Sequence, residues 1–130
     1  MKLLLDTHVA LWAIADDPRL ARKALRLIED FENDVFVSVA SLWEIAIKHS
    51  LGRGPRAMPL SAVDAAEAFE SAGYLLLPVE KSHALHVERL PSIHGDPFDR
   101  LIAAQALEEP LVLLTHDKTV ARYSASFIEV

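Results

Sequence analysis

The chain has 130 residues, a length typical of one domain with one hydrophobic core, and we expect residues 1–130 to form that single domain. Its apolar fraction of 52% excludes a disordered chain, and the absence of cysteine excludes disulfides and thiolate metal sites. The formal net charge of −6 argues against a general polyanion-binding surface, and we expect no direct sequence-specific contact with DNA.

Short apolar runs predict the strands of a sheet. They are continuous rather than alternating, which is typical of parallel strands covered on both faces. In chain order the runs are Lys2–Leu5, Val35–Val39, Tyr74–Val79 and Leu111–Thr115, with Phe127–Val130 as a candidate for a short edge strand.

The first apolar run, at Met1–Leu5, is not read as a signal peptide, because Asp6 and His8 interrupt it too early. No later run approaches the ~18 apolar residues of a membrane span. We therefore expect a soluble cytoplasmic protein that makes no membrane contact.

Helical patterns lie between the apolar runs. Strands that alternate with helices predict an α/β fold with a parallel sheet and right-handed crossovers. The expected helices are a short one after Asp6, one opened by Asp17-Pro18 and reaching Ile28, Leu42–Leu51 opened by Ser41, Ser61 to Gly73, His83–Leu90, one starting at Pro97, and Lys118–Tyr123.

Four acidic residues are expected at one edge of this sheet. Asp6 directly follows the first strand, and Asp117 follows the last long strand after one intervening residue. Glu44 and Asp99 are each expected in the first turn of a helix. Functional crevices of open α/β sheets lie at the carboxyl ends of the strands, so these carboxylates are predicted to meet there.

Each acid also has a purely structural explanation. Ser41 and Glu44 have the spacing of a capping box, and Asp96-Pro97 has the form of an N-cap followed by a helix-opening proline. Asp6 and Asp117 could likewise cap the helices that follow them. Asp99 is different, because a cap is already supplied by Asp96 and a second acid gains only about 0.3–1 kcal/mol from the helix dipole.

Carboxylates crowded into one crevice repel one another, and a divalent cation removes that repulsion. Oxygen ligands without cysteine suit Mg²⁺ or Mn²⁺ rather than Zn²⁺. Two such ions about 3.5–4 Å apart can assist the in-line cleavage of a phosphodiester. The residues alone therefore predict a metal-dependent site for phosphoryl transfer or phosphodiester cleavage.

Four segments of the sequence resemble the PIN domain of VapC-type toxins from bacterial toxin–antitoxin pairs. Together they span the chain from its first strand to Asp117, in the family's order. The segments are Leu4-Leu5-Asp6-Thr7-His8, Ser38 to Lys48 (SVASLWEIAIK), His94 to Ala103 (HGDPFDRLIA) and Leu114-Thr115-His116-Asp117.

The resemblance implies a three-layer α/β/α sandwich with a four- to five-stranded parallel sheet and Mg²⁺- or Mn²⁺-dependent endoribonuclease activity on RNA. It also implies a homodimer, inhibited by a small antitoxin whose C-terminal segment enters the acidic crevice. The family's catalytic and metal-binding acids fall on Asp6, Glu44, Asp99 and Asp117, with supporting polar residues at Thr7, Ser41 and Thr115.

Other polar and aromatic residues are read more conservatively. Arg100 and Lys118 are candidates to hold a phosphate, with a solvated or ion-paired position as the equal alternative, and Asp96 is read first as a cap. Lys48, Arg53 and Arg56 could form a basic rim for an RNA backbone. His83 and His86 share a helix face without a third metal ligand at matching spacing, His94 and His116 flank the acids without an assigned function, and Trp12 and Trp43 are expected in the core or a dimer interface.

Three other functions were weighed against a toxin ribonuclease. A phosphoacceptor signalling domain requires adjacent acids after the first strand and a lysine at the end of the last strand, and Asp6-Thr7-His8 and Thr115-His116-Asp117 supply neither. A haloacid-dehalogenase-type phosphatase requires an acid two residues after Asp6, where His8 stands. A non-catalytic PIN-like module that only docks a partner peptide is the remaining alternative. The identity of the RNA, the cleaved bond and the physiological metal are not encoded in any recognisable pattern.

Overall fold

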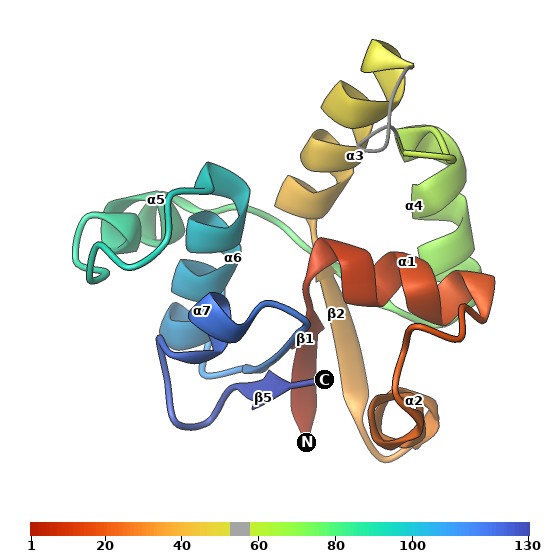
Figure 1. Ribbon diagram of the computed structural model, residues 1–130, viewed down its shortest axis with the longest axis horizontal. Coiled ribbons are helices and arrows are strands. Elements are labelled where there is room, and N and C mark those ends of the chain that lie inside the picture. The colour runs from red at the N-terminus through yellow and green to blue at the C-terminus, as the bar shows by residue number, and fades with distance from the viewer. Residues whose placement is uncertain (53–57) are drawn as a thin grey trace.

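The computed structural model describes residues 1–52 and 58–130 and contains a five-stranded parallel sheet with helices on both faces (Figure 1). The strand order is β3-β2-β1-β4-β5, and every neighbouring pair is parallel. The strands are β1 (Lys2–Leu5), β2 (Asp34–Ser38), β3 (Leu75–Leu77), β4 (Val112–Thr115) and β5 (Ile128–Glu129). The predicted parallel α/β sandwich is therefore confirmed, including its short edge strand.

Helices connect the parallel strands, because parallel neighbours require crossover connections. None of the helices in the described ranges combines the length and the apolar composition needed to cross a lipid bilayer. The helices are α1 (Thr7–Ala15), α2 (Arg22–Glu29), α3 (Val39–Leu51), α4 (Ala62–Ser71), α5 (Lys81–Val87), α6 (Pro97–Glu108) and α7 (Lys118–Ala121).

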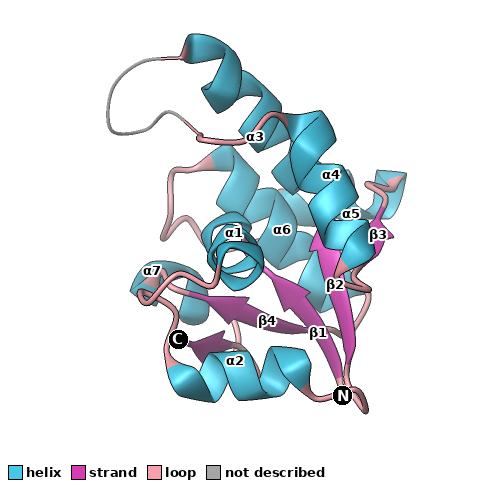
Figure 2. Cartoon of the chain, turned by 90° about the vertical axis from the view of Figure 1, so that its right-hand side faces the viewer, coloured by secondary structure: helices cyan, strands magenta, loops and turns pink. Residues whose placement is uncertain are grey.

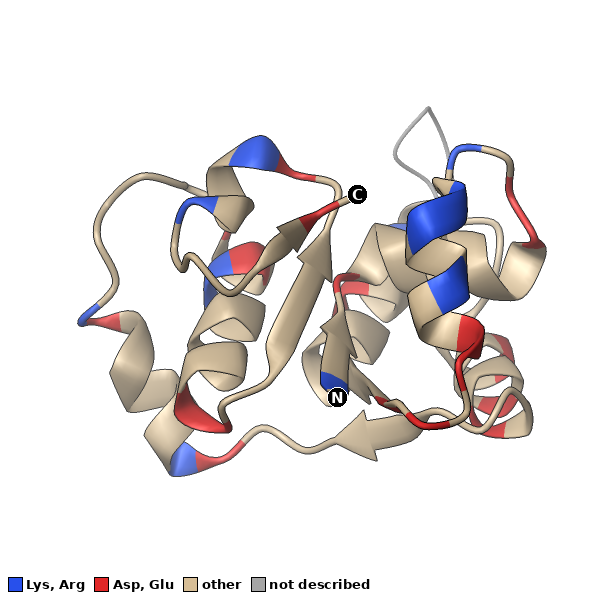
Figure 3. Ribbon diagram, turned by 90° about the horizontal axis from the view of Figure 1, so that it is seen from below, with Lys and Arg blue, Asp and Glu red and all other residues tan. Residues whose placement is uncertain are grey.

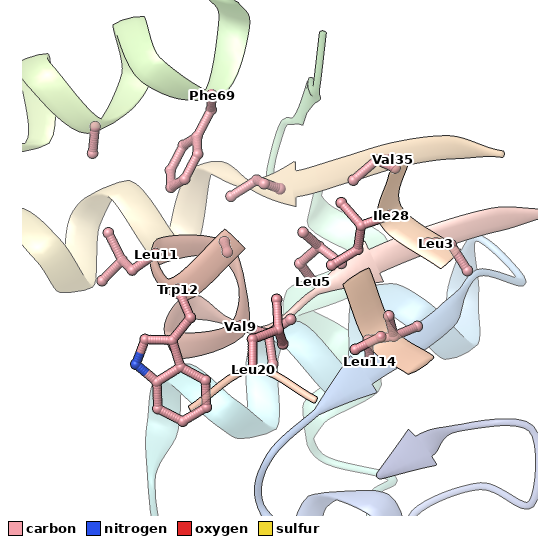
Figure 4. Packing of buried hydrophobic residues seen from close by; sticks show 14 of the residues in the cluster. Leu3, Leu5, Val9, Leu11, Trp12, Leu20, Ile28, Val35, Phe69 and Leu114 are labelled. Atoms are coloured by element: carbon pink, nitrogen blue, oxygen red, sulfur yellow. The ribbon is translucent and has the colours of Figure 1, made fainter. Parts of the chain in front are cut away.

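Alternate residues of β1 point into two separate apolar clusters. Leu3 and Leu5 pack with residues of α1, α2 and α4 on one face, among them Val9, Ile28 and Phe69 (Figure 4). All three layers are visible in Figure 2, where α1, α2 and α4 lie in front of the sheet. Since each fully buried leucine contributes roughly 1.5–3 kcal/mol, this cluster is a main source of the fold's stability.

The opposite face of the sheet is covered by α5, α6 and α7. Leu4 and Leu113 are fully buried there against Ile102 and the alanines of α6. The small side chains let α6 approach the sheet closely. The two clusters explain why the strand patterns are continuous rather than alternating: both faces are covered.

Helix α2 is amphipathic, as its sequence pattern predicts. Ala24 and Ile28 are buried, whereas Arg22, Lys23 and Arg26 are exposed and line its outer face (Figure 3). The expected start of this helix at Pro18 is wrong, because Asp17 accepts hydrogen bonds from the backbone and side chain of Arg19 and closes a separate turn.

Helix α3 also begins earlier than predicted. Its N-cap is Ser38, whose hydroxyl accepts a hydrogen bond from the backbone of Ala40 at 2.9 Å, whereas the hydroxyl of Ser41 turns inward toward Thr7. The predicted capping box of Ser41 and Glu44 is therefore absent. Glu44 lies in the second turn of α3, not in the first.

The shorter helices agree with prediction except at their ends. Helix α5 starts at Lys81 rather than His83, because Glu80 and His83 form a capping box around its first turn. Asp96 caps α6 at the predicted position, and Ser61, the expected start of a helix, is the N-cap of α4, which ends at Ser71.

The sheet reverses its strand order at β1, which lies between β2 and β4. Such a reversal opens a crevice at the carboxyl ends of the strands. Helix α1 leaves β1 at this edge, α3 leaves β2 there, and the short α7 leaves β4 (Figure 1). The fold therefore brings residues 6, 44 and 117 to the same edge, and α6 starts beside them.

Candidate active site

Asp6 is held rigidly at the end of β1. Its side chain is 7% exposed, and its Oδ1 accepts a hydrogen bond from the backbone of Val9 at 2.8 Å, which caps α1. Its Oδ2 accepts from the hydroxyl of Thr115 at 2.6 Å and from the backbone of His116 at 3.1 Å. Burial raises the pKa of Asp6 above its ordinary value, and these three hydrogen bonds lower it only in part.

Glu44 is buried on the inner face of α3. Its Oε1 accepts a hydrogen bond from the Thr7 hydroxyl at 2.6 Å, and the same hydroxyl lies 2.9 Å from Ser41 Oγ. Its Oε2 pairs with Lys48 Nζ one turn along the helix at 2.5 Å. Both oxygens of Glu44 are thus oriented by neighbours from α1 and α3.

Asp117 caps α7 with one oxygen and meets a histidine with the other. Oδ1 accepts from the backbones of Thr119 and Val120, and Oδ2 accepts from Nε2 of His94 at 2.8 Å. Burial raises the pKa of Asp117, but the hydrogen bonds from His94, Val120 and Thr119 outweigh burial, so the pKa lies below its usual value.

His94 connects two of the acids and is itself held in a fixed orientation. Its Nδ1 accepts a hydrogen bond from the backbone of Asp96 at 3.0 Å, which leaves Nε2 as the nitrogen that carries a proton. That Nε2 also lies 3.5 Å from Oδ2 of Asp99. The ligand atoms of His94, Asp99 and Asp117 all lie within 4.8 Å of one another.

Asp99 has the most unfavourable surroundings of the four acids. Within the described part of the chain its carboxylate meets only His94 Nε2, at 3.5 Å. Burial, followed by the negative charges of Asp96, Asp6 and Glu44, raises its pKa to about 7. A carboxylate placed among three others and given no strong hydrogen-bond donor favours a bound cation or a proton.

The four predicted acids line one cavity of about 460 Å³ at the predicted edge of the sheet. The cavity wall is completed by His8, Trp12, Arg19, Lys48, Asp96 and His116. A larger hollow of about 930 Å³ lies between α2, α4 and the starts of β2 and β3, and none of the four acids lines it. The four predicted acids therefore gather in the smaller cavity.

Two of the predicted supporting residues, Thr7 and Thr115, donate hydrogen bonds to the acids directly, and Ser41 contacts the Thr7 hydroxyl. Asp96 caps α6 with bonds to the backbones of Phe98 and Asp99, and it also lines the cavity. Arg100 binds the carbonyl oxygens of Val87, Pro91 and His94, so in this structure it anchors the loop that carries His94.

Of the remaining sequence candidates, Lys48 lines the cavity, whereas His83, His86, Arg53 and Arg56 lie away from the four acids or outside the described residues. His83 and His86 pair with Glu109 and Glu108, away from the four acids. Arg53 and Arg56 of the expected basic rim fall in the part of the chain that the structure does not describe, and Lys48 is paired with Glu44.

The two tryptophans have different environments. Trp12 is 9% exposed and packs in the core. Trp43 is 58% exposed beside Phe98, with ring centroids 4.9 Å apart, at the outer wall formed by α3 and α6.

Two contacts in the site were not predicted from the sequence. The ion pair of Lys48 with Glu44 was available as an i, i+4 spacing on one helix. The contact of His94 with Asp117 joins residues that are 23 positions apart, and no local pattern predicts it.

The donor set fits a hard divalent cation. Four carboxylates face one cavity. Asp6, Glu44 and Asp117 each accept short hydrogen bonds, whereas among the described residues Asp99 has only the 3.5 Å contact with His94. Oxygen donors of this kind suit Mg²⁺ and Mn²⁺.

The comparisons of this sequence and this fold with known proteins agree with one another. The sequence matches the PIN domain family over residues 3–125. Ribonuclease VapC22 of Mycobacterium tuberculosis is 34% identical over 119 residues, which cover 89% of this chain and 87% of that protein. The fold is similar to that of VapBC2 from Rickettsia felis bound to a promoter DNA fragment, with a TM-score of 0.69 and 19% identity over 100% of this chain and 98% of that one. It is also similar to VapC20 of Mycobacterium tuberculosis, a toxin that cleaves the sarcin–ricin loop, with a TM-score of 0.62 and 22% identity over 98% of each chain.

Proposed function

The chain belongs to the PIN domain family, and on that premise we propose that it is a metal-dependent endoribonuclease of the VapC toxin type. The observation that carries the proposal is the meeting of Asp6, Glu44, Asp99 and Asp117 in one cavity. These acids come from the ends of β1 and β4 and from α3 and α6. A cluster assembled from four separate elements is costly without a cation, because the charges repel one another in a partly buried space.

The four acids would hold Mg²⁺ or Mn²⁺, and one or two such ions supply Lewis acidity and a more acidic bound water. The protein's own contribution is orientation. Thr115 and the backbone fix Asp6, Thr7 and Lys48 fix Glu44, and His94 fixes Asp117. Substitution of such outer partners typically lowers metal affinity or activity by about 10–100-fold.

The substrate class is RNA, which the ribonuclease relatives support, and the bond cleaved is a phosphodiester. The test is incubation of purified protein with total cellular RNA, with the cut ends mapped by sequencing. We expect cleavage in Mg²⁺ or Mn²⁺ that EDTA abolishes. Cleavage by pure protein that is insensitive to EDTA would refute the proposal.

Asp99→Asn and Asp96→Asn form a matched pair for the same assay. Both acids line the cavity, but Asp96 caps α6 and asparagine is an equally good cap. We expect Asp99→Asn to lower cleavage by at least about 100-fold, as loss of a metal ligand would, and Asp96→Asn to keep it. Full activity in Asp99→Asn would show that the site is misplaced.

The partner we propose is a small antitoxin whose C-terminal segment enters the acidic cavity. Similarity to VapBC structures supports this partner, and promoter DNA would then be contacted by the antitoxin rather than by this chain. A segment with a basic side chain fits the cavity electrostatically. The test is inhibition of RNA cleavage by the purified antitoxin, and an antitoxin that leaves cleavage unchanged would contradict this part of the proposal.

We further propose that the chain forms a homodimer through α3. Four apolar side chains spaced four residues apart form an exposed stripe on this helix, namely Val39 (40% exposed), Trp43 (58%), Ile47 (39%) and Leu51 (69%). A contiguous exposed apolar stripe of this kind is typical of a protein interface.

A further inference from the structure

A buried polar contact joins the helix that carries Glu44 to the helix that carries Asp99. The hydroxyl of Ser38, the N-cap of α3, donates a hydrogen bond to Oε1 of Gln105 on α6 at 2.5 Å. Both side chains are fully buried, with 0% exposure. Gln105 is the one polar residue in the run Leu101–Leu107, and its place in the apolar face of a helix requires an explanation.

The amide of Gln105 is fixed in one orientation. Its Nε2 donates to the carbonyl oxygen of Pro78 at 3.2 Å, so its Oε1 must face Ser38. Ser38 Oγ in turn accepts from the backbone of Ala40 at 2.9 Å. Among the described residues no buried side-chain nitrogen or oxygen lacks a partner, so this connection is complete. A complete buried network is directional and rigid in a way that an apolar contact is not.

This contact lies equally far along the two helices from Glu44 and from Asp99. Ser38 lies six residues before Glu44, and Gln105 lies six residues after Asp99. At 1.5 Å per residue each acid is therefore about 9 Å along its helix from the contact. The two helices run antiparallel, so both acids lie on the same side of it, toward the cavity.

Within the described part of the chain, apolar contacts accompany this hydrogen bond between the helices. Ala40 on α3 belongs to the same apolar cluster as Ala103 on α6, and Trp43 meets Phe98 edge to face near the cavity. Apolar contacts are less directional than a hydrogen bond, so they specify the position of one helix along the other less strictly. Mg²⁺ requires near-ideal oxygen positions, so even a small slide would change its affinity.

We propose that the hydrogen bond between Ser38 and Gln105 positions the site, because it fixes α3 against α6 and thereby sets the separation of the Glu44 and Asp99 carboxylates. Neither residue touches the cavity, so both act through the helices that they join. The inference rests on the proposed function, since it assigns these residues to the geometry of the metal site.

The test is a titration of the metal-free protein with Mn²⁺. The EPR signal of the free ion reports how much Mn²⁺ is unbound, and the titration gives the dissociation constant. We expect Ser38→Ala and Gln105→Met each to weaken Mn²⁺ binding by about tenfold. The double variant should bind no more weakly than either single variant, because one contact is lost in all three. Ser38→Thr keeps the hydroxyl and should keep the affinity of the unaltered protein.

Ser61→Ala is the matched control. Ser61 caps α4 through the backbone of Asp64, and α4 carries none of the four acids. This control loses a helix cap, as Ser38→Ala does, and should keep its Mn²⁺ affinity. If Ser38→Ala does not fold, Gln105→Met, which keeps the cap, carries the same test.

The outcomes separate this inference from the proposed function. Normal Mn²⁺ affinity in Ser38→Ala and Gln105→Met, with only a loss of stability, would overturn the inference and leave the metal site intact. An unaltered protein that binds no Mn²⁺ would overturn the metal site and the inference together.

Discussion

Asp99 differs from the other acids in lacking a strong hydrogen-bond donor, and its pKa is raised from 3.8 to about 7 by burial and by the neighbouring carboxylates. Because the folded protein then binds more protons than the unfolded chain between these values, its free energy of unfolding falls as the pH rises from about 4 to about 7. Above pH 7 Asp99 is ionised, and the folded protein bears the full free-energy cost of this buried charge whenever no cation occupies the cavity.

Asp99→Asn should remove that cost. In EDTA at pH 8 we expect the variant to be more stable than the unaltered protein by about 1–2 kcal/mol, well below the full shift because the side chain is 25% exposed. The difference should shrink toward pH 4. Urea unfolding at both pH values measures it, and equal stabilities at pH 8 would contradict the description of Asp99.

Thr115 provides a second test at the scale of one residue. Its hydroxyl donates to Asp6 at 2.6 Å and accepts from the backbone of Asp117 at 3.0 Å, so it joins two of the acids. Thr115→Val removes one of the two hydrogen bonds to Asp6 Oδ2 and the hydrogen bond from the backbone of Asp117, and it should cost about 1–3 kcal/mol of stability. It should also weaken Mn²⁺ binding, whereas Thr115→Ser should restore both. Wild-type stability and affinity in Thr115→Val would show that the hydroxyl is dispensable.

At the scale of the element, the starts of helices show what the sequence can and cannot predict. Asp96 and Asp117 have the sequence positions of caps and act as caps, because each directly precedes the first helical residue. Ser38 and Ser41 lie three residues apart, and both are good N-caps. The choice of Ser38 depends on Gln105 and Thr7, which are distant in the sequence, so local pattern could not decide it.

Gly73 and Gly95 form a matched pair for backbone effects. Gly73 joins α4 to β3 with φ +85°, and no atom lies within 4 Å of the position that a Cβ would take. Gly73→Ala should therefore cost about 1–2 kcal/mol through backbone strain alone. Gly95 also has free space but no positive φ, so Gly95→Ala should change stability by less than about 0.5 kcal/mol. Thermal unfolding measures both, and equal effects would contradict this reading of the turn.

At the scale of the whole molecule, strand–helix alternation was sufficient to predict the parallel sheet and its crevice. The register β1 to β4, which brings Asp6 beside Thr115, follows from this topology rather than from any local signal. The contact of His94 with Asp117 and the anchoring of its loop by Arg100 depend on three-dimensional packing between distant segments. Sequence patterns describe neighbouring residues, so they could not predict these two contacts.

The apolar stripe on α3 gives a prediction for the assembly. Trp43→Glu or Ile47→Glu places a charge within the proposed interface and should convert a dimer to a monomer. Val63→Glu is the control, because Val63 is 69% exposed on α4, outside the stripe. Sedimentation velocity measures the outcome. A monomeric unaltered protein at micromolar concentration, or a dimer that survives both stripe variants, would contradict the proposal.

The most direct test of the central claim is a crystal structure of the protein soaked in Mn²⁺, with the ion located by its anomalous scattering. We predict a peak within the cavity, bound by carboxylates of Asp6, Glu44, Asp99 and Asp117, and its loss in Asp99→Asn crystals. Two results would contradict the claim that these acids gather around a cation. One is a cavity without Mn²⁺ in protein that cleaves RNA, and the other is Mn²⁺ bound elsewhere.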